Sequence, residues 1–503
     1  MSRAGYRTGH INGPLVRPVT GFKKWMHTSV ISPAAVRYLI THGIKVGVNM
    51  TRIVNWDPVL DVFKRRLAKW KAQVLSIGGR LTLVKSVLQS LPLYYFSLYS
   101  APKKIINDLE RLMRNFLWGG IDDVKKLHWV AWEKITIPKN KGGLGITRLE
   151  DCNDALILKW LWRYRLEGDV LWKKVIDAIH FKARNWELYP VVRGGGGVWL
   201  NIVTRGNRVS VDGSKFTALM QSKIGNGKMT RFWLDPWVGD TPLRIKFPSL
   251  YRLENDKLCK VADRLLKQGG ITKFAWNWKK VPITQDETIE LTGLRNQTST
   301  TILAENADGW NWNGGSDVGF VAAVKRWLSS RYSSSPELTF PWCKWLPSKC
   351  NIFFWRAISE RIPTKVALAH RNIHVTDLDC PLCREGVETA SHLFTGCGLS
   401  CSVWEAVAQW CRLPVIYAFD AKDLLSISIN SGRSPVYQEA IQGIIIITCW
   451  RIWKVRNDFI FKAKEVNRAE IFSDVKSFGF LWYKHRRKDS VCNWDTWCRF
   501  ALM

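Results

Sequence analysis

The sequence has no long hydrophobic run and few acidic residues. No segment approaches twenty consecutive apolar residues, and the longest candidate, residues 443–450, ends at Arg451, so we expect no membrane-spanning helix and no membrane partner. Asp and Glu number 42 against 75 Lys and Arg, which gives a net charge of +33. A charge of this size favours a polyanionic partner. Nucleic acid is the obvious one, because neutralising its phosphates releases counterions.

The first 45 residues contain no acidic side chain, and the first one in the chain is Asp57. An acid-poor leader with Arg, Ser and Thr is compatible with an organelle transit peptide, but Gly13-Pro14 and Pro18 interrupt any amphipathic helix there. We therefore expect residues 1–45 to form a basic, disordered leader, with organelle targeting as the alternative. No secretory signal is recognised, so the cysteines are expected to be reduced in a nuclear or cytoplasmic protein.

The most specific local pattern is CPLCREGVETASHLFTGC, which holds three thiols and one imidazole within eighteen residues. Soft sulfur and nitrogen ligands at this spacing can close a tetrahedron around Zn²⁺. The predicted ligands are Cys380, Cys383, His392 and Cys397. Four protein ligands leave no open position for a water molecule, so the zinc is predicted to be structural. Cys401 and His374 are the nearest substitute ligands, and the competing interpretation is four unrelated buried residues.

Apolar periodicity predicts a mainly α-helical protein with a small zinc-stapled module. An apolar stripe begins after Asp57-Pro58, and the pair Gly78-Gly79 is predicted to end its helix. The sequence also predicts a loop at residues 292–300. Further helices are predicted over residues 81–91, 102–118, 349–359, 364–370 and 437–484.

Two groups of basic residues are candidate phosphate contacts. The first group occupies the polar face of the first predicted helix and comprises Lys64, Arg65, Arg66, Lys69 and Lys71. The second group flanks the Cys/His pattern and comprises Arg361, Lys365, Arg371 and Arg384. Three thiolates, a neutral His and Zn²⁺ sum to about −1, so the flanking cations would have to attract the phosphate. The alternative is that these side chains only solvate the helices.

Three stretches resemble plant non-LTR (LINE-type) retrotransposon reverse transcriptases, downstream of their polymerase active site. Residues 70–120 begin with WKAQVLSIGGRLTLVKSVLQSLPLYYF and resemble the thumb region after the palm. GNGKMTRFWLDPW, residues 225–237, resembles the connector. WLPSKCNIFFWRAISERIPTKVALAHRNI, residues 345–373, followed by CPLC, ETASHLF and Cys397, resembles the reverse-transcriptase zinc-binding domain.

This resemblance implies five segments. They are a leader at residues 1–45, a thumb-like helical region at 46–150, a Trp-rich connector at 151–304, a reverse-transcriptase zinc-binding domain at 305–420 and a C-terminal helical tail at 421–503. The family's zinc ligands carry over onto the four Cys and His residues named above.

The family's chemistry does not carry over in the same way. A reverse transcriptase holds two metal ions with paired aspartates between strands, and the only Asp-Asp pair here is Asp122-Asp123. Lysines follow it and no hydrophobic strands flank it, so it is predicted to be a surface turn. We expect no intact reverse-transcriptase palm, no ribonuclease H site and no catalytic residues. The family is RNA-directed DNA polymerase, but this chain is expected to be inactive alone.

The leading hypothesis is a retroelement-derived fragment that binds zinc and nucleic acid, either RNA or DNA, without its own catalytic palm. One alternative is a part of an RNA-directed DNA polymerase that acts with a palm supplied in trans by another retroelement protein. The other alternative is a zinc-dependent protein-interaction module.

Overall fold

A computed structural model of the chain describes residues 48–70, 72–120, 126–180, 189–191, 197–268, 271–314, 319–332, 340–429, 434–487 and 492–501. The predicted leader, Lys71, Asp122-Asp123 and residues 192–196 lie outside these ranges. The described part of the chain is mainly helical and has three small antiparallel sheets, which confirms the predicted fold class.

The described residues form two compact units. Unit 1 comprises residues 48–50, 98–100 and 154–323, and unit 2 comprises residues 51–97, 101–153 and 324–503. Helices α8 (Leu149–Leu166) and α15 (Phe320–Ser329) contribute residues to both units. Residues from both ends of the sequence therefore share unit 2, and the middle of the chain forms unit 1.

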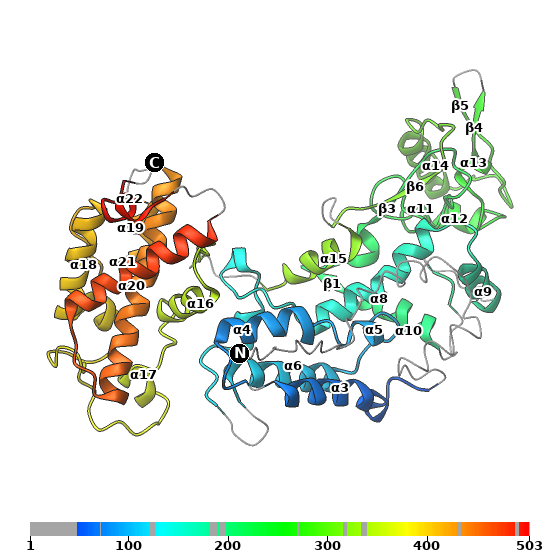
Figure 1. Ribbon diagram of the computed structural model, residues 1–503. Helices are drawn as coiled ribbons and strands as arrows, with labels where there is room; N and C mark the ends of the chain where they lie inside the picture. The colour runs from blue at the N-terminus through cyan, green and yellow to red at the C-terminus, as the bar shows by residue number, and fades with distance from the viewer. Residues whose placement is uncertain are drawn as a thin grey trace, which may run out of the picture. The chain divides into compact units, whose positions relative to one another are not determined.

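Unit 1 contains short helices and all of the described strands (Figure 1). Its strand pairs are β1 with β2 (Ser210–Val211, Ser214–Lys215), β3 with β6 (Met220–Lys223, Gly309–Trp312) and β4 with β5 (Leu265–Gln268, Ile271–Phe274). Its other elements are α9 (Leu171–His180), α10 (Val198–Arg208), η4 (Phe216–Leu219), α11 (Leu243–Lys246), α12 (Pro248–Leu253), α13 (Val261–Arg264) and α14 (Gln285–Thr298).

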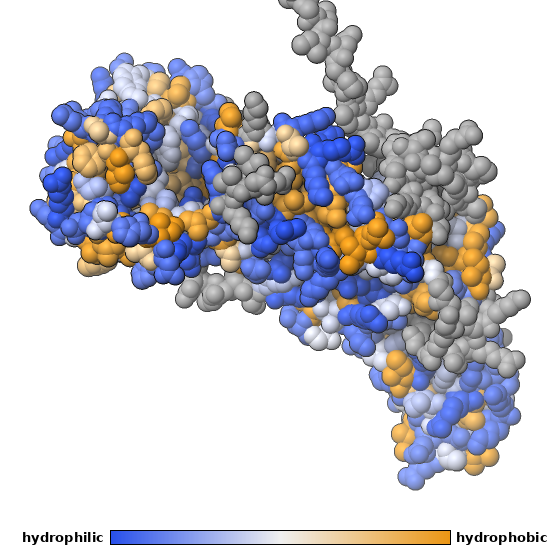
Figure 2. Space-filling model, turned by 90° about the horizontal axis from the view of Figure 1, so that it is seen from below, coloured by the Kyte–Doolittle hydropathy of each residue, from blue (hydrophilic) through white to orange (hydrophobic). Residues whose placement is uncertain are grey.

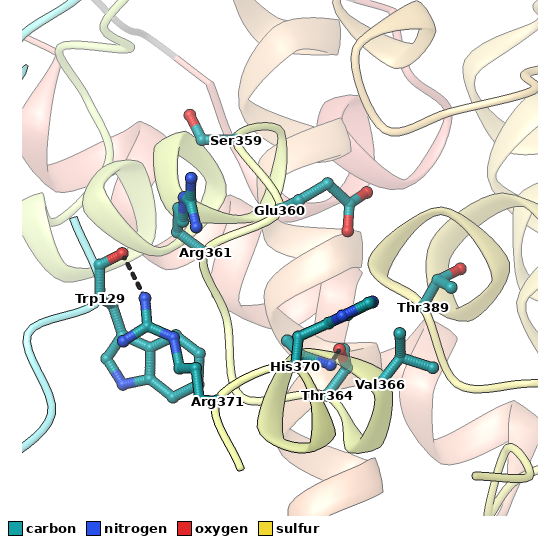
Figure 3. A pocket seen from close by; sticks show the side chains of 10 residues that line it. Trp129, Ser359, Glu360, Arg361, Thr364, Val366, His370, Arg371 and Thr389 are labelled. Carbon is teal, nitrogen blue, oxygen red and sulfur yellow. Dashed lines mark hydrogen bonds between the residues drawn. The ribbon is translucent and has the colours of Figure 1, made fainter. Parts of the chain in front are cut away.

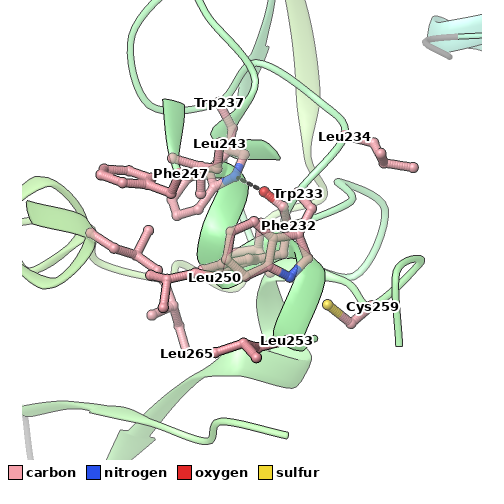
Figure 4. Close-up of a cluster of buried hydrophobic side chains, with 12 residues drawn as sticks. Phe232, Trp233, Leu234, Trp237, Leu243, Phe247, Leu250, Leu253, Cys259 and Leu265 are labelled. Carbon is pink, nitrogen blue, oxygen red and sulfur yellow. Dashed lines mark hydrogen bonds between the residues drawn. The ribbon is translucent and has the colours of Figure 1, made fainter. Parts of the chain in front are cut away.

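A buried aromatic and aliphatic cluster forms one core of unit 1 (Figure 4). Phe232, Trp233 and Trp237 come from the connector motif and pack against leucines of α11 and α12. The indole of Trp237 donates a hydrogen bond of 2.8 Å to the carbonyl oxygen of Phe232. The three aromatic side chains of this motif are therefore core anchors. The hydrogen bond of Trp237 provides the partner that a buried indole N–H needs.

The predicted loop at residues 292–300 is wrong, because most of it belongs to α14. The Thr284 hydroxyl accepts from the Glu287 backbone N–H, while the Glu287 carboxylate accepts from the Thr284 backbone N–H. This reciprocal capping box nucleates the helix. Its C-terminal half buries Leu294 and Thr298, which keeps the polar stretch helical.

The named elements of unit 2 are all helices, as far as its residues are described. Its N-terminal elements are η1 (Ile53–Trp56), α3 (Asp57–Lys69), α4 (Ile77–Leu83), η2 (Val84–Leu88), α5 (Leu93–Phe96), α6 (Lys103–Trp118), α7 (Trp132–Thr136) and η3 (Lys139–Lys141). Its C-terminal elements are α16 (Ser348–Ala357), α17 (Lys365–Ala369), η5 (His392–Gly396), α18 (Gly398–Cys411), α19 (Asp423–Ile429), α20 (Pro435–Lys462), α21 (Arg468–Arg486) and α22 (Trp494–Cys498).

The glycine pair Gly78-Gly79 does not end a helix, which corrects the sequence prediction. Helix α3 already ends at Lys69, and both glycines lie in the first turn of α4, whose N-cap is Ser76. A Cβ on Gly78 would lie 3.1 Å from the backbone nitrogen of Lys349 at the start of α16. Gly78 therefore permits a close approach between α4 and α16, two helices distant in sequence.

The other predicted helices are present. Helix α6 ends at Gly119, which adopts the left-handed conformation expected of a C-terminal glycine cap. Thr364 caps α17 through a hydrogen bond from the backbone N–H of Ala367. The predicted helix over residues 437–484 is divided into α20 and α21, which pack along each other.

The apolar stretch at residues 443–450 lies inside α20. Helices α16, α18, α19 and α21 all contact α20, and Ile444 to Ile447 are buried. Among the described residues, no helix is both long enough and apolar enough to cross a membrane. On the face drawn in Figure 2, hydrophilic residues predominate and hydrophobic ones form separate patches.

Candidate metal centre and basic surfaces

The four predicted zinc ligands lie together in unit 2. The ligand atoms of Cys380, Cys383, His392 and Cys397 are all within 4.8 Å of one another. The sulfurs of Cys380 and Cys397 are 4.0 Å apart, and the Cys383 sulfur lies 3.2 Å from Nε2 of His392. A tetrahedron with Zn–S bonds of about 2.3 Å has edges of similar length. The donor set and its spacing therefore fit a Zn²⁺ ion.

A tight hairpin presents the first two ligands. Asp379 and Val387 form an antiparallel bridge, and the backbone N–H of Cys380 donates to the carbonyl oxygen of Gly386 at 2.7 Å. Between them the chain turns back through Arg384, whose φ is +61°. The N–H of Glu385 points at the sulfur of Cys383 at 3.5 Å. Such backbone donors stabilise a thiolate, which is the form that binds metal.

The third and fourth ligands come from the next turn and the following helix. His392 begins the short π-helix η5, and Cys397 is the N-cap of α18. A hydrogen bond from Cys380 lowers the pKa of Cys397, and backbone N–H groups of Ser400 and Leu399 lower it further. A Cβ on Gly386 would lie 3.0 Å from Cε1 of His392. The hairpin therefore needs a residue without a side chain where the imidazole packs against it.

The substitute ligands take no part in this group. Cys401 is exposed on α18, and its thiol donates to the carbonyl oxygen of Thr395. His374 is also exposed and lies outside the group of four.

A buried ion pair that the sequence analysis did not identify supports the hairpin. Glu388 is fully buried, and Arg456 of α20 donates to both of its carboxylate oxygens at 2.6 and 2.7 Å. The same carboxylate accepts the backbone N–H of Lys365 at the start of α17. Glu388 thereby fixes the hairpin to two helices. The pair is separated by 68 positions, and ETASHLF contains no local signal of it.

The first basic group lies on the solvent face of α3. Lys64, Arg65, Arg66 and Lys69 are exposed, while Val59 and Phe63 are buried on the opposite face. The Arg65 guanidinium donates to the carbonyl oxygen of Asp61 in the preceding turn. Within the described ranges, none of these four cations forms an ion pair with a carboxylate.

The second basic group is divided between several environments. Arg361 and Arg384 are exposed, and the Lys365 ammonium forms an ion pair with Asp377. Arg371 donates to the carbonyl oxygens of His128 and Trp129 and lies over the Trp129 ring at 4.5 Å.

Two members of this group, Arg361 and Arg371, line the same pocket of about 440 Å³ (Figure 3). Thr389, three residues before His392, also lines it. The pocket therefore connects the basic residues with the metal-binding hairpin.

The connector motif in unit 1 uses its polar groups internally. The Asp308 carboxylate accepts four backbone N–H groups of the loop GNGKMT, from Gly225, Gly227, Met229 and Thr230, at 2.8 to 2.9 Å. These bonds hold the pKa of Asp308 below its usual value, although burial alone would raise it. The loop is therefore a structural turn, and the four amides that donate to Asp308 are not available to a phosphate.

The second half of the motif contains a buried charge cluster. Asp235 is buried and forms ion pairs with Arg231 at 2.8 Å and with Arg165 at 2.9 Å. Burial favours the neutral acid, but the two guanidiniums overcome it and hold the pKa of Asp235 at about 2. Both arginines therefore have a carboxylate within unit 1.

Comparison with known proteins places the Cys/His hairpin in a recognised domain. The family described as zinc-binding in reverse transcriptase matches residues 321–404. A provisionally named ribonuclease H protein of Arabidopsis thaliana is 27% identical over 421 residues, which are 81% of this chain and 65% of that protein. The chain thus spans a little less than two thirds of this relative.

Two further relatives match shorter parts. An uncharacterized mitochondrial protein of Arabidopsis thaliana is 30% identical over 156 residues, which are 31% of this chain and 97% of that protein. The transposon TX1 uncharacterized 149 kDa protein of Xenopus laevis is 30% identical over 123 residues, which are 24% of this chain and 9% of that protein.

Proposed function

Because this chain belongs to the non-LTR retrotransposon-derived proteins that carry a reverse-transcriptase zinc-binding domain, we propose that unit 2 binds RNA or DNA and is held in shape by a structural zinc ion. The carrying observation is that the Cys₃His group shares this unit with exposed basic residues that have no carboxylate partner among the described residues. In this proposal the chain supplies binding only. Polymerisation would need paired aspartates from a palm in another polypeptide.

The structural role of the metal is supported by its ligands. Four protein donors complete a tetrahedron and leave no position for an activated water. Cys380 and Cys397 are fully buried, while Cys383 and His392 are partly buried. The ion would therefore join the hairpin to α18, and its removal is expected to loosen both.

Metal analysis of single-cysteine variants tests this assignment. Wild type should carry one zinc per chain, and Cys380→Ser should lose most of it because a serine hydroxyl is a poor zinc ligand. Cys401→Ser is the matched control, since it removes a thiol four residues after a ligand, and it should keep stoichiometric zinc. A Cys380→Ser protein that still binds one zinc would contradict the ligand set.

The nucleic-acid proposal is supported by the charges on α3. Lys64, Arg65, Arg66 and Lys69 present four exposed cations within six positions of α3. Such a row can track phosphates without reading bases. Binding should therefore be largely independent of sequence and should weaken steeply as salt rises.

A gel shift or anisotropy titration at several salt concentrations tests this proposal. Changing the four α3 cations to Gln should weaken binding by at least tenfold at low salt and reduce the salt slope. A matched control neutralises four exposed cations of unit 1, namely Arg208, Lys215, Lys223 and Lys228. Wild-type protein that binds neither RNA nor DNA at low salt would contradict the proposal and favour a protein-interaction module.

A further inference from the structure

A cavity of about 780 Å³ lies in unit 2, where residues of α4, α6, α16, α17 and α20 meet. Five of its lining residues are basic, and none of the described lining residues is Asp or Glu. The basic ones are Arg80, Lys126, Arg356, Lys365 and Arg456. The volume is within the range of pockets that hold small ligands.

Two of these five cations are neutralised by carboxylates, Lys126 is exposed, and the other two have no carboxylate partner among the described residues. Lys365 and Arg456 form ion pairs with carboxylates. Arg80 and Arg356 form no ion pair with any described residue, and their hydrogen bonds go to the carbonyl oxygens of Ala72 and Arg361. Two guanidiniums therefore face the cavity's interior without a counter-ion in the described part of the chain.

This arrangement is unfavourable for the empty protein. Burial, followed by repulsion from Arg371 and Arg80, lowers the pKa of Arg356 to about 10. Burial also lowers the pKa of Arg80. Both side chains remain charged at neutral pH, so the protein keeps like charges together in a poorly hydrated place. An anion in the cavity would relieve that repulsion.

The guanidinium of Arg356 is held in position before any ligand binds. It lies over the rings of Trp118 and Trp129, at 5.4 and 5.7 Å from their centroids. Its Nε donates to the carbonyl oxygen of Arg361. A guanidinium has five N–H donors, so four remain on its two terminal nitrogens. Prior fixation reduces the entropy lost on binding.

Two donors in the same wall lack an acceptor. Nε of Arg80 and Nε1 of Trp118 are buried and have no hydrogen-bond partner among the described residues. Buried donors are normally paired, because an unpaired one has lost its hydrogen bond to water without gaining another. Arg371 and Trp129 extend the basic lining into the neighbouring pocket, where Figure 3 shows the guanidinium beside the indole.

We infer that this cavity binds one backbone phosphate of a nucleic-acid strand, with the guanidiniums of Arg80 and Arg356 as its two donors. The inference rests on the proposed function and names a site within it that the sequence analysis did not predict. Phosphate oxygens match the planar donor fork of arginine. Neither residue belongs to the two basic groups identified from the sequence.

The test measures the affinity of fluorescent 20-nucleotide single-stranded RNA and DNA at several salt concentrations. The variant is Arg80→Gln with Arg356→Gln, and Arg468→Gln on α21 is the control. Arg468 is exposed and already paired with Glu405. The double variant should bind about tenfold more weakly, with the slope of log affinity against log salt reduced by about 1. The control should change affinity less than twofold.

The two proposals fail in different ways. Wild type that binds neither oligonucleotide would contradict the proposed function itself. Wild type that binds with a steep salt dependence, while the double variant binds equally well, would contradict only the phosphate site.

Photo-cross-linking of the wild-type protein provides a second measurement that needs no variant. An oligonucleotide that carries 4-thiouridine should cross-link to peptides containing Trp118, Trp129 or Arg356. Cross-links confined to α3 would overturn the inference even if the double variant fails to fold.

Discussion

Arginines that are withdrawn from solvent differ in their counter-ions between unit 1 and one cavity of unit 2. In unit 1, Arg165 and Arg231 share the carboxylate of Asp235, and Arg264 is paired with Glu254 at 2.8 Å. In unit 2, Arg80 and Arg356 line one cavity and have no carboxylate partner in the described ranges. Both groups consist of arginines. Those of unit 1 are neutralised by carboxylates of the same unit, whereas Arg80 and Arg356 are not neutralised by any described carboxylate.

The comparison separates charge that supports the fold from charge that is available to a ligand. A buried cation with its own carboxylate is already neutralised, and breaking that pair leaves an isolated charge in a poorly hydrated place. A cation without one gains by meeting an external anion. Removing a carboxylate from unit 1 should therefore cost stability, whereas removing an unpaired arginine from unit 2 should cost binding.

The largest stability effect is expected from Asp235→Asn. It leaves two buried guanidiniums without a carboxylate, and the free energy of unfolding of unit 1 should fall by about 3–5 kcal/mol. Urea unfolding followed by tryptophan fluorescence measures this change. Oligonucleotide affinity, measured under conditions where the variant is folded, should stay within twofold of wild type.

The pH dependence of this variant gives a check with a definite sign. The pKa of Asp235 is about 2 in the folded protein and 3.8 as an ordinary aspartate. Its stabilising contribution is therefore fully present above about pH 4 and is lost as the pH falls towards 2. The stability difference between wild type and Asp235→Asn should shrink over that interval. A difference that stays constant would contradict the ion-pair interpretation.

The next effect is expected from Asp308→Ala. Four backbone N–H groups of the GNGKMT loop would lose their acceptor, and water can replace only part of it because the loop is partly buried. We expect a loss of about 2–3 kcal/mol, measured by urea unfolding. Asp240→Ala removes an exposed carboxylate from the same unit that, among the described residues, accepts a hydrogen bond only from Thr241, and it should change stability by less than about 0.5 kcal/mol. Equal losses in both variants would show that the loop does not depend on Asp308.

These features differ in how far the sequence reveals them. The zinc ligands lie within eighteen residues, and their chemical type and spacing predict a group that the structure brings together. The predicted helices over residues 102–118 and 364–370 agree closely with α6 and α17, because capping residues such as Gly119 and Thr364 act on their sequence neighbours. At α14 two local signals conflict. The polar residues 292–300 favour a loop, whereas Thr284 and Glu287 form a capping box that favours a helix, and the structure shows the helix.

Features that join distant segments could not be predicted from sequence. The pair Gly78-Gly79 predicts a helix end. In the structure, the small size of Gly78 instead permits the close approach of α16, which begins 270 positions later. Glu388 and Arg456 are ordinary charged residues until the fold brings them together. Arg80 and Arg356 are 276 positions apart, and only the fold brings them into one cavity. The sequence does not indicate that no described carboxylate neutralises them there.

Two arginines that line the same cavity, Arg356 and Arg456, should differ in how much their substitution lowers the free energy of unfolding. Arg456→Gln leaves Glu388 buried without its cation and should lower the free energy of unfolding by about 3 kcal/mol. Arg356→Gln removes a charge that is repelled by Arg80 and Arg371, which offsets the lost contacts with Trp118 and Trp129. Its stability should therefore lie within about 1 kcal/mol of wild type.

Urea unfolding of the two variants in low salt measures the contrast. High salt should reduce any stabilisation of Arg356→Gln, because screening weakens the repulsion that the substitution removes. If Arg356→Gln destabilises the protein as strongly as Arg456→Gln, Arg356 is a structural residue with a compensated charge. The distinction between arginines with and without a carboxylate partner would then fail in unit 2.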